Sequence, residues 1–576
     1  MRLRCLHDAS GSISFRPICD RNSGVPRQGM ALYTVASQQR TRSGISSLAG
    51  PLILLGIAVI LSAVSRRTVT HLARWSDIYA LVLVCAAFAG AIAFSSVRYR
   101  DFSPPLRITS FAIGMTIFVQ LLFDSWGPFA GPPNILFGSG DKILFFRYGA
   151  VLAVVAGIAA IWRPSFLVPL FYFYHAWREM VSVVSGIFVT ETDYLGMLDI
   201  GNFCVLGVLG TMVLTSAWTM DRMPRLRTVF ASTGGVKELR DRAYGLIWAC
   251  AVGAHLGSYF WSGIAKLQAG GEKPWTWLFA NPTQTSILMG LERGDAPLGL
   301  WPGVLQMVWD AIVSNQLLFN ASVLGAQLLS PLAAISTRAL SFFCLLFDLF
   351  HVGVYFTLGA LFFFWIALNL FIVAAARTLP RDGFTPAMKL VMVVTIVCGR
   401  FFFYTNFLGW LDGPKLASPR IFVETRDGRQ ILAPSTYFGI YSYMIGTGTM
   451  YIPENHFRAR VGGNSHDLAS WHDAITCGPE TLPRQDTGVA MEAVEKLIRR
   501  TDHFFRVNPW VKENNIFYAY PHHMLSNPWM YPAFNKLTMN DIVAYHYIVD
   551  SVCLSLKEGK LMRDVRKRTD YQIDPR

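Results

Sequence analysis

The chain has 576 residues, of which 52% are hydrophobic and only 15% are charged, and it contains 41 Phe and 16 Trp. This composition excludes an ordinary soluble enzyme and is typical of an α-helical polytopic membrane protein with a polar appendage. The formal net charge of +14 would suggest nucleic-acid binding in a soluble protein. In this chain it indicates basic loops facing anionic headgroups, so we expect membrane lipid as a partner and no nucleic acid.

The N-terminal residues 1–46 are polar and basic and lack an apolar core long enough for a signal peptide. We expect a disordered or wrongly assigned extension, since a start at Met30 would remove a stretch of no evident use. The nine cysteines form no C-x-x-C pair, and most of them lie in apolar runs. They predict no metal framework.

Residues 47–410 predict a transmembrane helical domain of about 10–11 spans, since each apolar run approaches the roughly 20 residues that a spanning helix needs. The segment 268–300 is rich in Trp, Pro and Gly and is too broken for a straight span, so we expect it to be interfacial or re-entrant. The apolar runs cover residues 47–65, 77–96, 105–126, 143–161, 166–186, 194–217, 243–266, 317–335, 339–359, 360–376 and 388–410.

Loop charge predicts the orientation in the membrane. The loop Asp221–Arg242 holds six Lys and Arg, the loop 377–389 holds three, and the loop 190–193 holds none. Under the positive-inside rule the first two loops are cytoplasmic. The N-terminus is then cytoplasmic and residues 411–576 are extracytoplasmic, in a bacterial inner membrane or an ER-type membrane. In this orientation the basic residues of segment 66–74 lie on the extracytoplasmic side, which conflicts with the positive-inside rule.

One apolar helix carries a polar stripe. His255, Tyr259, Ser262 and Lys266 follow each other at steps of four, three and four, so they share one helix face. Ionisable groups at membrane depth are costly and usually face a bundle interior or a wet cavity. Alternatively, Lys266 extends to the interface from the helix end, and His255 is a buried histidine bonded to a backbone carbonyl.

Two segments resemble a known family. The segment Tyr259-Phe-Trp-Ser-Gly-Ile-Ala-Lys-Leu267, followed by a Trp-rich stretch, resembles the lysine motif of the vitamin K-dependent γ-carboxylase family. Bacterial relatives share its multi-helix membrane region, the HTTM domain. The segment Phe347-Asp-Leu-Phe-His-Val-Gly-Val-Tyr-Phe-Thr-Leu-Gly359 is similar to the family's helix with an inward histidine. The resemblance covers roughly residues 47–410.

The resemblance implies a membrane-embedded enzyme that is a carboxylase-like lyase or ligase coupled to hydroquinone oxidation. Its cofactor would be a reduced, vitamin K-like quinone, and a glutamate of a protein or peptide would be the substrate. Lys266 would be the base near the extracytoplasmic side, in its neutral form, and His351 would bind the developing oxyanion. The family's Asn-Asn-His motif is absent, because this chain has Asp199-Ile-Gly-Asn202 at that place. Carboxylation itself is therefore in doubt.

Further ionisable residues lie in the apolar runs. Asp348 and His351 share a helix face, and Arg400 could either neutralise Asp348 or hold an anionic ligand. The expected catalytic residues are thus Lys266 and His351. The expected cofactor-binding residues are His255, Tyr259, Asp348 and Arg400.

A second polar cluster is expected on the run 166–186. His175, Arg178 and Glu179 share one helix face. Because Arg178 and Glu179 are adjacent in sequence, we expect both to find partners on other helices. A structural polar network is favoured here over a substrate contact.

Residues 411–576 predict a small extracytoplasmic α+β domain. Asp427-Gly428 between β-rich runs indicates a hairpin, and residues 487–504 form an amphipathic helix. An oxidising location would allow Cys477 and Cys553 to pair. A metal site is disfavoured, because His466, Asp467, His472 and Asp473 lack a familiar ligand spacing.

Three functional hypotheses remain open from the sequence. The first is the quinone-using enzyme. The second is a non-catalytic membrane subunit or scaffold of a larger complex, in which the polar stripes only hold helices together. The third is a transporter, for which we would expect inverted repeats, and the two halves show no evident internal symmetry.

Overall fold

The structure is a computed structural model, and its contacts divide the chain into two units, residues 1–48 and 49–576. The backbone is described for residues 33–125, 145–185, 193–231, 235–269, 273–380, 383–409, 413–441, 444–445, 448, 450–459, 468–479, 489–507 and 530–575.

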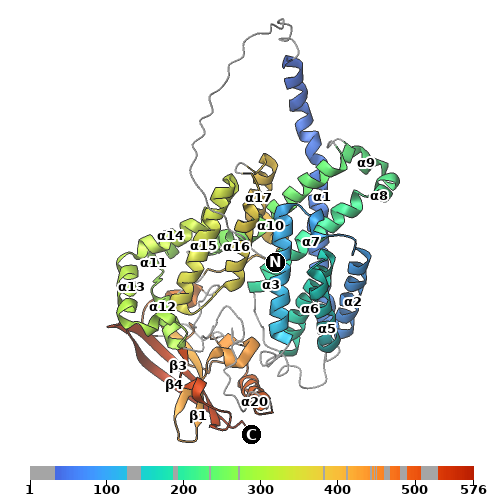
Figure 1. Ribbon diagram of the computed structural model, residues 1–576. Coiled ribbons are helices and arrows are strands. Elements are labelled where there is room, and N and C mark those ends of the chain that lie inside the picture. The colour runs from blue at the N-terminus through green and yellow to red at the C-terminus, as the bar shows by residue number, and fades with distance from the viewer. Residues whose placement is uncertain are drawn as a thin grey trace, which may run out of the picture. The chain divides into compact units, whose positions relative to one another are not determined.

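The described chain is mostly helical, with one small antiparallel sheet near its C-terminal end (Figure 1). The helices in the first half are α1 (Tyr33–Trp75), α2 (Asp77–Ala93), α3 (Pro104–Ser125), α5 (Ala150–Ala160), α6 (Leu167–Ser185), α7 (Asp193–Leu214), α8 (Ala217–Arg222) and α9 (Pro224–Ala231). The later helices are α10 (Val236–Gln268), α11 (Thr276–Ala280), α12 (Thr285–Arg293), α13 (Pro302–Ser314), α14 (Gln316–Leu328), α15 (Thr337–Leu358), α16 (Phe363–Ala376), α17 (Pro386–Cys398), α19 (Leu468–Ala474) and α20 (Met491–Val507).

Four helices among the described residues are long and apolar enough to cross a membrane: Leu48–Trp75, Pro104–Leu122, Gly196–Leu214 and Thr337–Leu358. Shorter apolar helices cover Asp77–Ala93, Ala150–Ala160 and Phe363–Ala376. Each of these seven helices overlaps one of the apolar runs of the sequence, and the first extends ten residues beyond its run, to Trp75.

For two of the apolar runs the prediction of one straight helix is wrong. The run 317–335 is broken, because α14 ends at Leu328 and a 3₁₀ turn, η6 (Ser330–Ile335), follows it. Pro331 has no N–H to continue the α-helical hydrogen bonding. The run 388–410 is helical only to Cys398, beyond which lies the single 3₁₀ turn η7 (Gly399–Phe401).

Helix α10 is the central element of the fold. It has 33 residues and is therefore about 50 Å long. It packs on α17, α7 and α14. Its approach to α17 depends on Gly253, where an added Cβ would lie 2.7 Å from the carbonyl oxygen of Met392. A side chain at this position would force the two helices apart.

The sheet has the strand order β2-β1-β3-β4 and is antiparallel throughout. Its strands are β1 (Lys415–Thr425), β2 (Gln430–Leu432), β3 (Ile542–Lys557) and β4 (Lys560–Ile573). The expected hairpin at Asp427-Gly428 is confirmed by the pairing of Glu424 with Gln430. The longer β3–β4 hairpin was not expected from the sequence. It turns at Glu558-Gly559, which both have positive φ, as a tight two-residue hairpin turn requires.

Ion pairs to the buried Glu292 join this sheet to α12. Glu292 of α12 accepts hydrogen bonds from Arg563 at 2.7 and 2.9 Å and from Ser418 at 2.7 Å. Asp550 of β3 accepts from Arg563 at 2.6 Å and from Arg568 at 2.7 Å. Both carboxylates are almost inaccessible to solvent. The sheet is therefore linked to the helical part through a buried carboxylate, Glu292, whose partners include Arg563 of the sheet.

The disulfide Cys477–Cys553 ties the segment after α19 to β3. The two residues are 76 positions apart in sequence. The bond therefore closes a long loop within the C-terminal region.

Two basic residues near the end of α1 are paired with acidic residues of other helices. Arg66 lies 2.6 Å from Asp199 of α7, and Arg74 lies 2.9 Å from Glu179 of α6. His175 is 3.6 Å from Asp199. Glu179 thus has the partner on another helix that the sequence predicted.

Candidate active site

A buried cavity of about 100 Å³ lies beside the end of α10. Its walls come from α10, α14, α15, α16 and the irregular segment that follows η7. The lining residues are Ser258, Tyr259, Ser262, Lys266, Gln327, Phe350, His351, Val354, Phe362, Trp365, Asn406 and Leu408. Lys266, His351 and Tyr259, which the sequence singled out from two distant segments, therefore line one cavity.

Lys266 is buried in the last turn of α10. Only 4% of its surface is exposed. Its Nζ donates to the carbonyl oxygen of Leu408 at 3.2 Å and reaches that of Ser262 at 3.5 Å. The indole ring of Trp277 lies 5.3 Å away. The side chain is held in the cavity wall, in contrast to the alternative in which it extends to the surface.

Tyr259 and His351 meet across the cavity wall. The Tyr259 hydroxyl is 3.0 Å from Nε2 of His351, and its ring stacks on Phe347 with the centroids 3.7 Å apart. The amide nitrogen of Asn369 donates to the Tyr259 oxygen at 3.0 Å and to Asp348 at 2.7 Å. The His255 ring contacts the Asn369 oxygen at 2.8 Å. Asn369 therefore joins His255, Tyr259 and Asp348.

This network determines which nitrogen of His351 carries a proton. The Tyr259 oxygen already accepts from Asn369, so its own proton is free to go to Nε2 of His351. A neutral His351 then carries its hydrogen on Nδ1, an assignment that follows from the hydrogen-bond pattern. Within the described part of the chain, Nδ1 is buried and has no hydrogen-bond partner. His351 therefore has one unused donor.

Two other side chains of the cavity also carry buried polar atoms without a hydrogen-bond partner among the described residues. They are Oε1 of Gln327 and Nε1 of Trp365. A buried polar atom left unpaired costs about 1–3 kcal/mol. Such atoms usually have an unseen water or ligand as partner. An acceptor and two donors around one small space are the pattern of a polar ligand site.

The sequence analysis did not predict a role for Asn369, although the sequence contains a signal for it. It is the only polar side chain in the run from Leu361 to Ala376, and a lone amide in such a run needs a partner. His255 and Asp348 do not line the cavity themselves. They lie behind its wall, connected to it through Asn369.

Arg400 lies outside this site. It is exposed, with its guanidinium 4.1 Å from the ring centroid of Phe407 and 5.1 Å from that of Trp261. The suggested Asp348–Arg400 ion pair does not form, since Asp348 is bound to Asn369. Aromatic rings stabilise the cation here instead of a carboxylate.

The histidines and carboxylates of the C-terminal region do not assemble a site in the described chain. Asp473 pairs with Lys415 at 2.6 Å, and the ring of His472 lies 4.8 Å from that of Trp471, tilted by 43°. His466 and Asp467 lie outside the described residues. No group of three or more His, Cys, Asp or Glu suited to a metal ion occurs among the residues that are described.

Comparisons of the chain with family models, curated proteins and solved structures found no match.

Proposed function

We propose that the chain is a polytopic membrane enzyme in which Lys266 acts as a general base on a reduced quinone, as in the vitamin K-dependent γ-carboxylase family that it resembles. The observation that carries this proposal is the shared cavity of Lys266, Tyr259 and His351. These residues come from two helices about ninety positions apart, and both of their sequence segments resemble motifs of that family. In the proposed orientation the N-terminus is cytoplasmic, and the cavity and residues 411–576 face the other side.

The chain's own groups suit a proton transfer. The proposal requires Lys266 in its neutral form, the form that can accept a proton. The unused N–H of His351 can donate to an oxygen that becomes negative as its proton leaves. Tyr259 and Asn369 keep that N–H in place. Lys266 would be the base, His351 the oxyanion donor, and Tyr259 and Asn369 the positioning residues.

The fit of a quinone to this cavity is chemically good and sterically tight. The unpaired atoms of His351, Gln327 and Trp365 match the oxygens of a quinone ring. The present volume of about 100 Å³ is below the roughly 300–1,000 Å³ of typical ligand sites. Binding therefore requires the lining to move, and the segment with Asn406 and Leu408 is the part that belongs to no helix. When bound, the quinol would supply the acidic hydroxyl and the reducing electrons.

The substrate that would react after the quinol is less defined than the base. The family's Asn-Asn-His motif is replaced by Asp199 and Asn202, and Asp199 is occupied by Arg66. Glutamate carboxylation is therefore not part of the proposal. The proposed reaction class is oxidation of a reduced quinone started by proton abstraction, with dioxygen, which the family resemblance implies as oxidant, taking up the two electrons of the quinol.

A lipid extract of the purified protein tests ligand binding. Val354 lines the cavity, whereas Leu349 on the same helix is 68% exposed. We expect wild type and Leu349→Trp to retain quinone, and Val354→Trp to lose it because the indole fills the cavity. Equal quinone in both variants would refute the site. A stable stoichiometric protein complex without quinone would support the non-catalytic subunit instead.

A further inference from the structure

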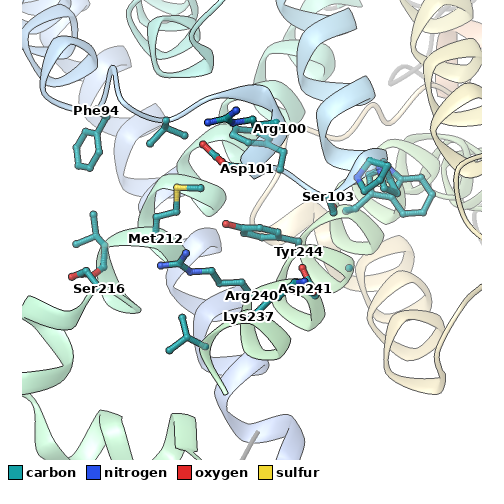
Figure 2. Close-up of a pocket in the computed structure, with 18 of the residues that line it drawn as sticks. Phe94, Arg100, Asp101, Ser103, Met212, Ser216, Lys237, Arg240, Asp241 and Tyr244 are labelled. Carbon is teal, nitrogen blue, oxygen red and sulfur yellow. Dashed lines mark hydrogen bonds between the residues drawn. The ribbon is translucent and has the colours of Figure 1, made fainter. Parts of the chain in front are cut away.

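A second and larger cavity lies at the opposite end of α10. Its volume is about 1330 Å³, and it is bounded by the α2–α3 connection, the end of α7, the start of α10 and the segment before α17 (Figure 2). Tyr244 in this cavity and Lys266 in the first are 22 positions apart on one helix, which corresponds to about 33 Å. The two cavities are therefore separate sites. In the proposed orientation the larger one faces the cytoplasm.

Three cations line this cavity without ion-pair partners. Arg100, Lys237 and Arg240 form no ion pair with any residue that the structure describes. Arg240 uses only Nε, which donates to Thr215 at 2.7 Å. Its two terminal nitrogens have no hydrogen bond within the described chain. Asp101 and Asp241 line the same space, so the charged lining has a net excess of one positive charge.

Two hydroxyl groups of the lining are also unused. Tyr244 is only 2% exposed, and its hydroxyl has no hydrogen-bond partner among the described residues. The same holds for the buried Oγ of Ser103. Figure 2 shows the Tyr244 ring and the Arg240 side chain extending from α10 into the space below Arg100 and Asp101. Cations and hydroxyl donors together are the groups that bind phosphate oxygens.

An apolar groove adjoins this cavity. It has a volume of about 430 Å³ and lies among α1, α2, α6 and α7. Phe94 and Val213 line both spaces, so the groove and the cavity meet at these two residues. Gly90 and Gly210 lie along the groove and leave room in it. A charged, hydroxyl-lined chamber that borders an apolar groove fits an amphiphile.

We propose that this composite site binds a phospholipid. Its phosphate lies beside Arg240 and Tyr244, and one acyl chain lies in the groove along Gly90. Arg100 and Lys237 attract the anionic headgroup to the mouth of the cavity. A soluble phosphate ester would use the chamber but leave the groove without an occupant. The groove therefore favours the lipid.

Native mass spectrometry of the full-length, delipidated protein tests the proposal with three probes. These are dioleoyl phosphatidylglycerol, dioleoyl glycerol and glycerol 3-phosphate. We expect phosphatidylglycerol to bind at least about tenfold more tightly than either of the others, because only it has both phosphate and chains. Equal binding of glycerol 3-phosphate would overturn the lipid assignment. Equal binding of dioleoyl glycerol would overturn the phosphate assignment.

Matched variants locate the site. Arg240→Gln should weaken phosphatidylglycerol binding about tenfold or more, whereas Arg242→Gln, which removes the same charge two positions away beside Glu238, should not. Gly90→Leu should block the groove, while Gly56→Leu is the control. At both glycines an added Cβ meets no atom within 4 Å, so both variants should fold. If the members of each pair bind lipid equally, the proposed site is wrong.

Discussion

Replacing Asp550 with Asn tests whether buried charges hold the sheet to the helical part. Asp550 is 0% exposed and accepts hydrogen bonds from Arg420 at 2.8 Å, Arg563 at 2.6 Å and Arg568 at 2.7 Å. Asn at this position removes the charge and turns an N–H group toward these donors. Arg420 and Arg563 would then share Glu292 as their remaining buried carboxylate partner among the described residues.

Two arguments give the magnitude. Burial disfavours ionisation of Asp550, but the hydrogen bonds from Arg568 and Arg563 outweigh it and lower the pKa of this carboxyl from 3.8 to about 2. That shift corresponds to about 2 kcal/mol. Removing one partner of a buried ion pair costs about 3–5 kcal/mol. For 576 residues the entropy of unfolding is about 1.2 kcal/mol/K, so the melting temperature should fall by about 2–4 °C.

The assay is thermal unfolding of the purified protein, with Asp427→Asn as the control. Asp427 also pairs with an arginine, Arg429, but both side chains are more than half exposed, so we expect little change. Because the folded pKa of Asp550 is lowered, its contribution is complete above pH 4 and is lost as the pH falls toward 2. Equal melting temperatures of Asp550→Asn and wild type at pH 7 would refute the reasoning.

Three other outcomes follow from the structure. Burial lowers the pKa of His546, but hydrogen bonds to Glu424 and Asp570 outweigh this effect and raise the pKa above 6.5. The stabilisation by the charged His546 is therefore complete below pH 6.5 and is lost as the pH rises through the folded pKa. The difference in melting temperature between wild type and His546→Gln should accordingly shrink from pH 5.5 to 9. Gly253→Ala should destabilise by about 1–3 kcal/mol through its clash with Met392, and Gly56→Ala should not, as thermal melting of both would show. Asn369→Leu should leave His255 and Asp348 unpaired, at about 1–3 kcal/mol for each group, and should lower quinol turnover about tenfold. The exposed Asn315→Leu serves as its control, and equal effects in the two would contradict the network.

The sequence predicted local features well and long-range partners poorly. The hydrophobic runs located most helices, because burial and helix formation depend on residues close in sequence. Pro331 was visible as a helix breaker but was outweighed by the apolar run around it. The β3–β4 hairpin was missed because β4 is rich in charged residues and lacks the alternation of a half-buried strand.

In the candidate site, too, local features could be predicted from the sequence and long-range contacts could not. The stripe from Tyr259 to Lys266 and the residue His351 could be found from spacing and resemblance. Their link through Asn369 could not be found that way, because it joins residues more than a hundred positions apart. Charge alone suggested that Arg400 neutralises Asp348 or holds an anionic ligand, whereas its neighbours in space are Phe407 and Trp261. Opposite charge indicates that a partner is needed, but the fold decides which one.

Turnover of a reduced quinone by Lys266→Arg tests the central claim most directly. Arginine keeps the positive charge but cannot lose its proton at an accessible pH. We therefore expect Lys266→Arg to abolish oxidation of reduced menaquinone, measured as dioxygen consumption, with an unchanged melting temperature. Lys273→Arg, at an exposed lysine seven positions away, should retain full activity. Equal turnover by Lys266→Arg and wild type would show that Lys266 serves only as a cation in the wall of the cavity.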